Sequence, residues 1–234
     1  MSRNFFKVGA AAAAVMALTT ACAQTNDSGE SGDNTAGGSD SAAVAIGTTD
    51  KVSSLDPAGS YDNGSFLVMN QVYPFLLNTV PGTEDMTPTP DIAESADFTE
   101  PTEYTVKLKE GLTFANGNEL TSSDVKFTFD RQIAINDPNG PASLLGSLDS
   151  IETPDDLTVV FHLKAANDQT FPGVLTSPVG PIVDEDVFPA DAIMPDDEII
   201  AAKPFAGQYT ITDYKLNELT AFAPFDGYKG SLGA

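Results

Sequence analysis

The sequence predicts an α+β (mixed α/β) fold, in which short strands pair through hairpins and helices interrupt them. Apolar and polar residues alternate over residues 104–108 and again over 157–163, as in strands with one buried face. From Ser65 to Leu76 the apolar residues recur at three- and four-residue spacing instead, as on one face of a helix. Both periods occur in one chain, so the predicted architecture mixes sheet and helix.

The first residues have the pattern of an export signal. Arg3 and Lys7 precede an apolar run over residues 8–18, which is much shorter than the ~20 residues that span a membrane as a helix. The residues leading into Cys22 then resemble the lipobox of bacterial lipoproteins, although Thr19 replaces its usual aliphatic residue. This resemblance implies cleavage just before Cys22 and a membrane lipid on that residue, at the extracytoplasmic face of the cell membrane. The alternative is an ordinary secretory signal, which would leave a free thiol.

Composition separates a polar tether from the folded part. Residues 22–42 are rich in Ser, Gly and acidic side chains and hold no large apolar residue, so they cannot bury enough surface to offset the entropy of ordering. The chain has 34 acidic and 11 basic residues, a net charge of −23, and loss of Arg3 and Lys7 on export would take it to about −25. Such a surface repels polyanions, which excludes a nucleic-acid partner.

The folded part is expected to open with a strand and a helix. Residues 43–48 are mainly apolar and form the strand, which turn residues end at 54–57. The helix that begins at Ser65 has to end close to Pro74, because proline lacks the amide proton that an interior helix position donates. Residues 79–90, rich in Pro, Gly and Thr, form a loop.

Further strands are predicted in pairs. The strand at 104–108 is followed by a short strand at 112–114 and by a hairpin-type turn at Asn116–Gly117. Two more strands are expected at 209–212 and 219–223.

A second helix is predicted between the strands at 104–108 and 157–163. Thr121 and Asp124 have the spacing of a capping box, which starts a helix. Val125, Phe129 and Ile133 then follow at four-residue steps and form one apolar stripe.

Several segments carry motifs in a particular order. They read LDPA at 55–58, QVYPFL at 71–76, PDIAES at 90–95, EYTVKLKEGLTFANG at 103–117, LTSSDVKFTFDR at 120–131, AGQYTI at 206–211 and FDGYKG at 225–230. Together they resemble the solute-binding proteins of ABC importers, extracellular family 5, which take peptides and nickel.

The resemblance implies the first lobe of a periplasmic-binding-protein-like type II (cluster C) fold, incomplete here. It divides the chain into a lipoprotein signal peptide at 1–21, the tether at 22–42, a partial first domain at 43–64 and 176–234, and a smaller inserted domain at 65–175. Family members are longer and close two lobes about a hinge, and the resemblance stops where the second lobe should begin.

The function that the resemblance implies is capture of a peptide or other small solute for delivery to ABC permease subunits, without a cofactor. Candidate solute contacts come from two loops: Tyr61, Asp62 and Asn63, and Gly140, Pro141 and Ser143. Both loops also fit plain turn chemistry. Because such proteins desolvate a solute between two closing lobes, we expect this chain alone to bind it weakly or not at all.

The sequence lacks the motifs and residue clusters that indicate an enzyme or a metal-binding protein. His162 is the only histidine, and no second histidine or cysteine cluster could share a metal ion with it. The motifs of serine hydrolases, zinc proteases and P-loop proteins are absent from the sequence. The chain is therefore not expected to be an enzyme. Two alternatives to import remain: a surface-anchored lipoprotein that acts as an adhesion or interaction module, and an inactive gene remnant.

Overall fold

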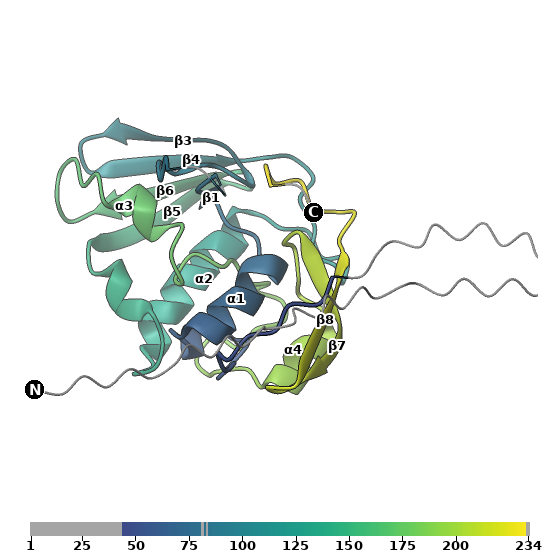
Figure 1. Ribbon diagram of the computed structural model, residues 1–234. Helices are drawn as coiled ribbons and strands as arrows, with labels where there is room; N and C mark the ends of the chain where they lie inside the picture. Colours follow the sequence, from purple (N-terminus) through teal and green to yellow (C-terminus); the bar gives the residue numbers. More distant parts are fainter. Residues whose placement is uncertain (1–43, 81, 83, 233–234) are drawn as a thin grey trace, which may run out of the picture. The chain divides into compact units, whose positions relative to one another are not determined.

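A four-stranded antiparallel sheet is the largest regular element (Figure 1). The structure, a computed structural model, describes residues 44–80, 82 and 84–232. The strands lie in the order β3-β4-β6-β5, with bounds β3 Ala93–Glu100, β4 Glu103–Leu108, β6 Thr158–Leu163 and β5 Leu148–Asp155. The two strands predicted from alternation, β4 and β6, are the central pair, with Val106 opposite Val159.

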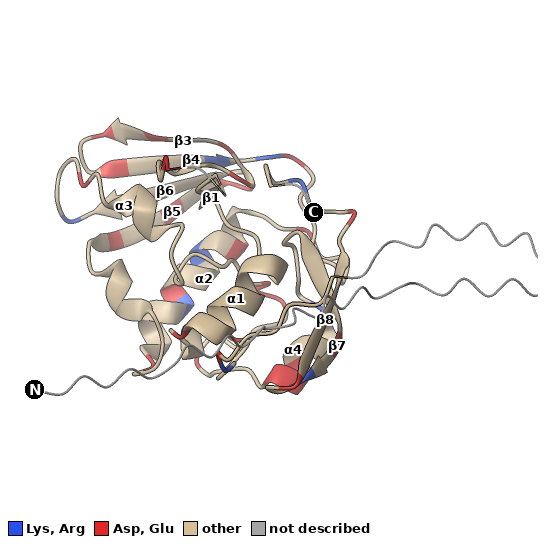
Figure 2. Ribbon diagram, in the orientation of Figure 1, with Lys and Arg blue, Asp and Glu red and all other residues tan. Residues whose placement is uncertain are grey.

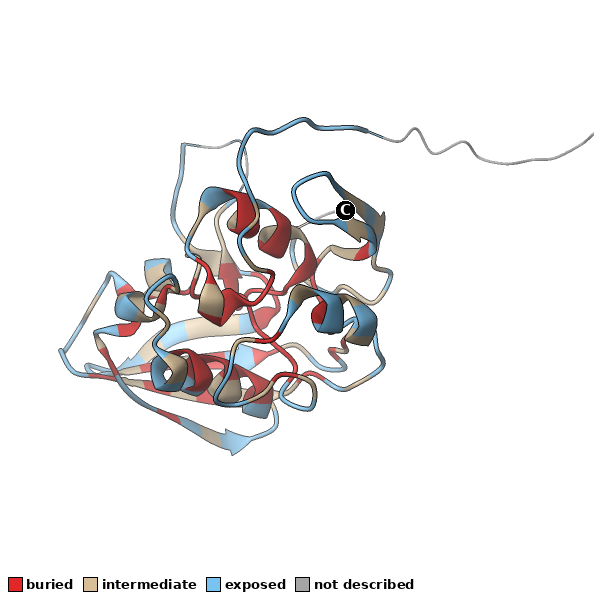
Figure 3. Cartoon of the chain, turned by 90° about the horizontal axis from the view of Figure 1, so that it is seen from below, coloured by how far each residue is buried: buried red, intermediate tan, exposed pale blue. Residues whose placement is uncertain are grey.

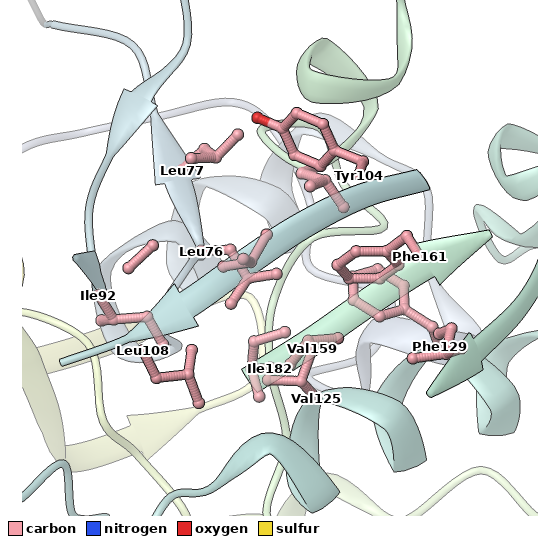
Figure 4. Close-up of a cluster of buried hydrophobic side chains, with 14 of the residues drawn as sticks. Leu76, Leu77, Ile92, Tyr104, Leu108, Val125, Phe129, Val159, Phe161 and Ile182 are labelled. Carbon is pink, nitrogen blue, oxygen red and sulfur yellow. The ribbon is translucent and has the colours of Figure 1, made fainter. Parts of the chain in front are cut away.

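Helix α2 (Ser122–Ile135) packs against the buried face of this sheet. Val125 and Phe129 of α2 lie against Val159 and Phe161 of β6 (Figure 4). The rings of Phe129 and Phe161 meet edge to face with centroids 5.5 Å apart, a geometry that adds about 0.5–1.5 kcal/mol to the burial of their area. The apolar residues of the alternating segments thus form the core, as predicted.

The predicted capping box starts α2, but one residue of the predicted stripe is misplaced. The Asp124 carboxylate accepts a hydrogen bond from the backbone N–H of Thr121 at 2.8 Å, as a capping box requires. Ile133 is 46% exposed, so its predicted burial is wrong. Eight residues after Val125, the helix has turned ~80° away from the core face, and Gln132 is buried in that turn instead.

Asp124 makes the stability depend on pH. Burial raises the pKa of its carboxyl to about 6 from an ordinary 3.8, although N–H groups of Thr121 and Glu185 donate to it. The folded state therefore binds this proton more tightly than the unfolded state does. The resulting stabilisation is complete below about pH 4 and is lost as the pH rises through about 6.

We expect Asp124→Asn to remove this dependence, since an amide does not titrate but still accepts the capping hydrogen bond. The free energy of unfolding of the wild type, relative to the variant, should fall by about 1–2 kcal/mol from pH 4 to pH 6. Urea unfolding of both proteins at the two pH values measures this difference. The same change with pH in both proteins would contradict the prediction.

The other predicted helix and hairpin are also present. Helix α1 (Asn63–Val72) ends with Tyr73 as its C-cap, immediately before Pro74. Strands β7 (Tyr209–Lys215) and β8 (Leu219–Pro224) form an antiparallel hairpin. The remaining elements are η1 Pro57–Gly59, β1 Leu77–Asn78, β2 Thr89–Pro90, η2 Ala142–Leu145, α3 Phe171–Val174 and α4 Asp196–Ala202. β2 pairs with β1 and takes up the end of the predicted loop.

Two predicted strands are wrong. Residues 44–48 lie in no strand, because a short apolar run does not make a strand without a partner whose backbone groups it can bond. Residues 112–114 make only a single bridge, from Thr113 to Glu119. The chain reverses at once after them, at Gly117 with a φ of 99°. The predicted signal peptide, Cys22 and the tether lie outside the described residues.

Buried apolar side chains form two clusters within the described residues 47–232. Figure 3 colours the buried residues red along the chain, and Figure 4 shows part of the first cluster. The sheet cluster includes Leu76, Val106, Phe129, Phe161 and Ile182. The hairpin cluster includes Leu55, Met69, Tyr73, Phe205 and Ile211. α2 contributes Val125 and Phe129 to the first cluster, and α1 contributes Val68, Met69 and Val72 to the second.

A buried ion pair connects α2 to the residue before η1. Arg131 donates to both carboxylate oxygens of Asp56, at 2.8 and 2.6 Å, and their side chains are 1% and 0% exposed. Asp56 also accepts from the N–H groups of Ala58 and Met194, while Arg131 donates to two carbonyls of segment 189–192. Buried charges need such complete hydrogen bonding, and here it fixes the loop that leads into α1.

Candidate functional site

Asp62, one of the predicted contacts, caps the start of α1. Its carboxylate accepts from the N–H and hydroxyl of Ser65, at 2.8 and 2.9 Å, and from the hydroxyl of Ser53. Burial alone would raise the pKa of this carboxyl, but the hydrogen bonds from Ser53 and Ser65 outweigh it and hold the pKa below 3.8. Asp62 is therefore charged at neutral pH and engaged in holding the helix end.

Tyr61 and Asn63 extend from this cap into solvent. Tyr61 is 53% exposed, and Asn63 is exposed as well. An open hollow of about 370 Å³ is lined by Asp50, Lys51, Tyr61, Asp62, Asn63 and Gly64. The structure thus adds Asp50 and Lys51, which the sequence did not indicate, to the three predicted residues.

Gly64 allows this hollow to form. A Cβ atom at this position would lie 2.2 Å from the carbonyl oxygen of Lys51, so the chain passes directly over the first turn of α1. The Asn63–Gly64 pair was the signal in the sequence that could have indicated a close approach of two backbones.

The second predicted loop packs behind the first. A Cβ atom at Gly140 would lie 2.1 Å from the carbonyl oxygen of Ala58, so this loop is pressed against η1, just before Tyr61. Pro141 is buried and Ser143 is exposed. Neither residue lines the hollow, so the structure brings this loop near the first one without joining the two in one pocket.

The surface of α1 beside the hollow is uncharged. The helix has no Lys, Arg, Asp or Glu, whereas α2 and α4 carry several (Figure 2). Leu67 of α1 is 49% exposed. In a chain with a net charge of −23, this is a place where an uncharged group can approach without desolvating a carboxylate.

Two kinds of feature are not found in the part of the chain that the structure describes. No three His, Cys, Asp or Glu side chains are grouped so as to hold a metal ion. Carboxylate oxygens of Glu103 and Glu152 lie 3.6 Å from different ring nitrogens of His162, so they do not converge on one point. Nor is any described helix both long and apolar enough to cross a bilayer.

The model of bacterial extracellular solute-binding proteins, family 5 (middle), matches residues 87–233, more than half of the chain. The chain belongs to this family. Its members are extracytoplasmic solute-binding proteins and not enzymes, which confirms the assignment made from the ordered motifs.

Curated relatives are longer than this chain. The oligopeptide-binding protein AppA of Bacillus subtilis is 30% identical over 163 residues, which are 68% of this chain and 29% of AppA. The probable D,D-dipeptide-binding periplasmic protein DdpA of Escherichia coli is 32% identical over 124 residues, 52% of this chain and 24% of DdpA. The chain therefore spans less than a third of the length of either relative.

Solved structures show the same partial fold. AppA of Bacillus subtilis in complex with a nonapeptide has a TM-score of 0.60 at 24% identity, over 74% of this chain and 34% of that one. The substrate-binding domain of an oligopeptide ABC transporter from Bacillus anthracis reaches 0.66 at 18% identity, over 77% and 37%. These likenesses confirm the predicted type II periplasmic-binding-protein fold, present in part. The roles of the two predicted loops stay predictions.

Proposed function

We propose that this chain captures peptides as the first lobe of an ABC-importer binding protein that delivers them to permease subunits. Family membership carries the proposal. The names of the relatives support a peptide over nickel: AppA is oligopeptide-binding and was solved with a nonapeptide. The hollow suits such a solute, because the Tyr61 ring can cover an apolar side chain and the Asn63 amide can bond to peptide groups.

We further propose that the lobe is divided as the family resemblance implies, with residues 65–175 inserted between 43–64 and 176–234. The two clusters support this division. The hairpin cluster draws on Leu55 and on residues 183–211, whereas the sheet cluster draws mainly on residues between 76 and 182. Helix α1 is the exception, since its buried side packs in the hairpin cluster.

Binding by this lobe alone should be weak. In two-lobed proteins, hinge closure removes water from both sides of the solute, whereas a solute lying in the open hollow stays hydrated on one side. We expect a dissociation constant well above ~1 μM, equivalent to less than ~8 kcal/mol of binding free energy. Calorimetry with a mixed peptide library measures this affinity, and submicromolar binding would refute the proposal that one lobe alone binds weakly.

Tyr61→Ala tests the location of the site. In a nuclear magnetic resonance titration with a nonapeptide at millimolar concentration, shifts should cluster at residues 50–51 and 61–64. The substitution should weaken binding about tenfold, since it removes an aromatic contact. Phe222→Ala is the matched control, because Phe222 is 39% exposed on β8 and does not line the hollow. Equal affinity of the Tyr61→Ala and Phe222→Ala proteins, or shifts elsewhere, would place the site outside this loop.

We also propose that Cys22 anchors the chain to lipid on the extracytoplasmic face of the membrane. The proposal rests on the export signal and the lipobox-like residues. Membrane-fraction protein should have its N-terminus at Cys22 and carry the mass of acyl chains, and Cys22→Ser should abolish that mass. A wild-type protein that is cleaved but lacks acyl mass would support the secretory alternative.

A further inference from the structure

The segment 225–232, here called the strap, is held by one buried carboxylate. Asp91 follows β2 directly and is 1% exposed. Its Oδ1 accepts from the Tyr228 hydroxyl at 2.6 Å, from the Ser231 N–H at 2.7 Å and from the Ser231 hydroxyl at 3.2 Å. Its Oδ2 accepts from the side-chain amide of Asn78 at 3.2 Å. Asp91 therefore connects the strap to the β1–β2 ladder, 137 residues earlier in the chain.

Two lysines strengthen this junction between the strap and Asp91, one from the residue after β4 and one from the strap itself. The Lys109 ammonium donates to the backbone carbonyls of Asp91 and Lys229, at 2.6 and 2.9 Å. The Lys229 ammonium donates to the carbonyl of Glu110 at 3.1 Å. The strap is thus bonded both to the residue after β2 and to the two residues that follow β4.

The arrangement leaves no space for a side chain at Gly230. A Cβ atom there would lie 2.0 Å from the Tyr228 hydroxyl oxygen and 2.3 Å from Oδ1 of Asp91. A side chain at this position would therefore push apart the Tyr228 hydroxyl and Oδ1 of Asp91, which form the 2.6 Å hydrogen bond.

Few other contacts hold the strap, and one of them is the hydrogen bond from the Phe225 N–H to the Gln208 carbonyl at 2.9 Å. It contains no helix or strand, and its residues are exposed or half-buried, with only the Tyr228 ring packed against the sheet cluster. Burial of a carboxylate is unfavourable unless hydrogen bonds compensate it. Here the compensating donors come mainly from the strap, so the hydrogen bonds of the Asp91 carboxyl group fix the position of an otherwise weakly held segment.

The junction also unites three of the ordered motifs. Asp91 belongs to the motif at 90–95, Lys109 to that at 103–117, and Tyr228 to that at 225–230. None of the three lines the hollow beside α1. The three residues therefore meet at the strap and not at the proposed solute site.

We propose that Asp91 is a positioning residue, which fixes the strap on the sheet and so sets the direction in which the chain leads from the hairpin toward a second lobe. Hinge closure moves one body about a joining segment, and that segment has to be fixed at one end. The reference to a second lobe rests on the proposed function, whereas the attachment of the strap does not.

Hydrogen exchange of the whole chain, followed by mass spectrometry, tests the attachment. In Gly230→Ala and in Tyr228→Phe, peptides from the strap should exchange at least about tenfold faster than in the wild type, while peptides from β4 and β6 stay unchanged. If the substitutions only lowered the stability of the whole protein, hydrogen exchange would instead become faster in the strap and in the sheet together.

Tyr214→Phe is the matched control, because the Tyr214 hydroxyl donates to the Asp196 carboxylate at 2.8 Å on the hairpin. It should leave exchange in the strap unchanged. Unchanged strap exchange in Gly230→Ala, or a parallel rise in strap and sheet, would overturn the proposal. No peptide ligand is used, so this outcome is separate from failure of the solute-binding proposal.

Discussion

Arg131→Met is expected to lower the free energy of unfolding by about 3–5 kcal/mol, the usual cost of leaving a buried charge without its partner. Methionine fills much of the volume but donates no hydrogen bond, so the Asp56 carboxylate stays buried and loses the bonds at 2.8 and 2.6 Å. The contact of the guanidinium with the Phe188 ring, 5.2 Å away, is lost too. For a domain that is stable by only 5–15 kcal/mol, this is a large fraction.

Lys126→Met is the matched control, five residues earlier on the same helix. Lys126 pairs with Asp130 at 2.5 Å, but their side chains are 41% and 49% exposed. Exposed pairs contribute less than about 1 kcal/mol, so this variant should unfold close to the wild-type urea concentration. If Arg131→Met were no more destabilising than Lys126→Met, the buried pair could not be what fixes the loop before α1.

Local patterns predicted the elements whose signals are contained within a few residues. Alternation placed β4 and β6, and Thr121 with Asp124 placed the start of α2. β3 was not predicted, because its buried and exposed residues do not alternate regularly and its hydrogen bonds come from pairing with β4. α4 was not predicted either. Its first turn has three acidic residues, which favour a helix start, but the helix has only seven residues, too few to show a clear helical period.

The hollow beside α1 depends on contacts that no local pattern contains. Family resemblance indicated the loop that carries Tyr61, but Lys51 reaches the hollow only because Gly64 lets one backbone pass over another. The ion pair between Asp56 and Arg131 joins residues 75 apart, and nothing in either neighbourhood specifies the other. Sequence reasoning therefore named the loop, whose role stays a prediction, and did not predict the contacts that hold it.

Gly64→Ala should destabilise the protein, although the same change inside a helix usually stabilises it by about 0.5–1 kcal/mol. The new Cβ would lie 2.2 Å from the carbonyl oxygen of Lys51 and 2.4 Å from its carbonyl carbon. These are backbone atoms that cannot rotate away, so the segment has to move off α1. That movement breaks the hydrogen bonds from the N–H groups of Ser53 and Ser54 to the Ser65 hydroxyl, at 2.9 and 3.3 Å.

We expect a net loss of about 1–3 kcal/mol in urea unfolding, together with faster hydrogen exchange at residues 50–54. Gly173→Ala in α3 is the control, because nothing lies within 4 Å of a Cβ atom there, and it should be neutral or slightly stabilising. Peptide binding should weaken in Gly64→Ala alone, since one wall of the hollow is displaced. If both variants behaved alike, the close approach of Lys51 to α1 would have no role in shaping the site.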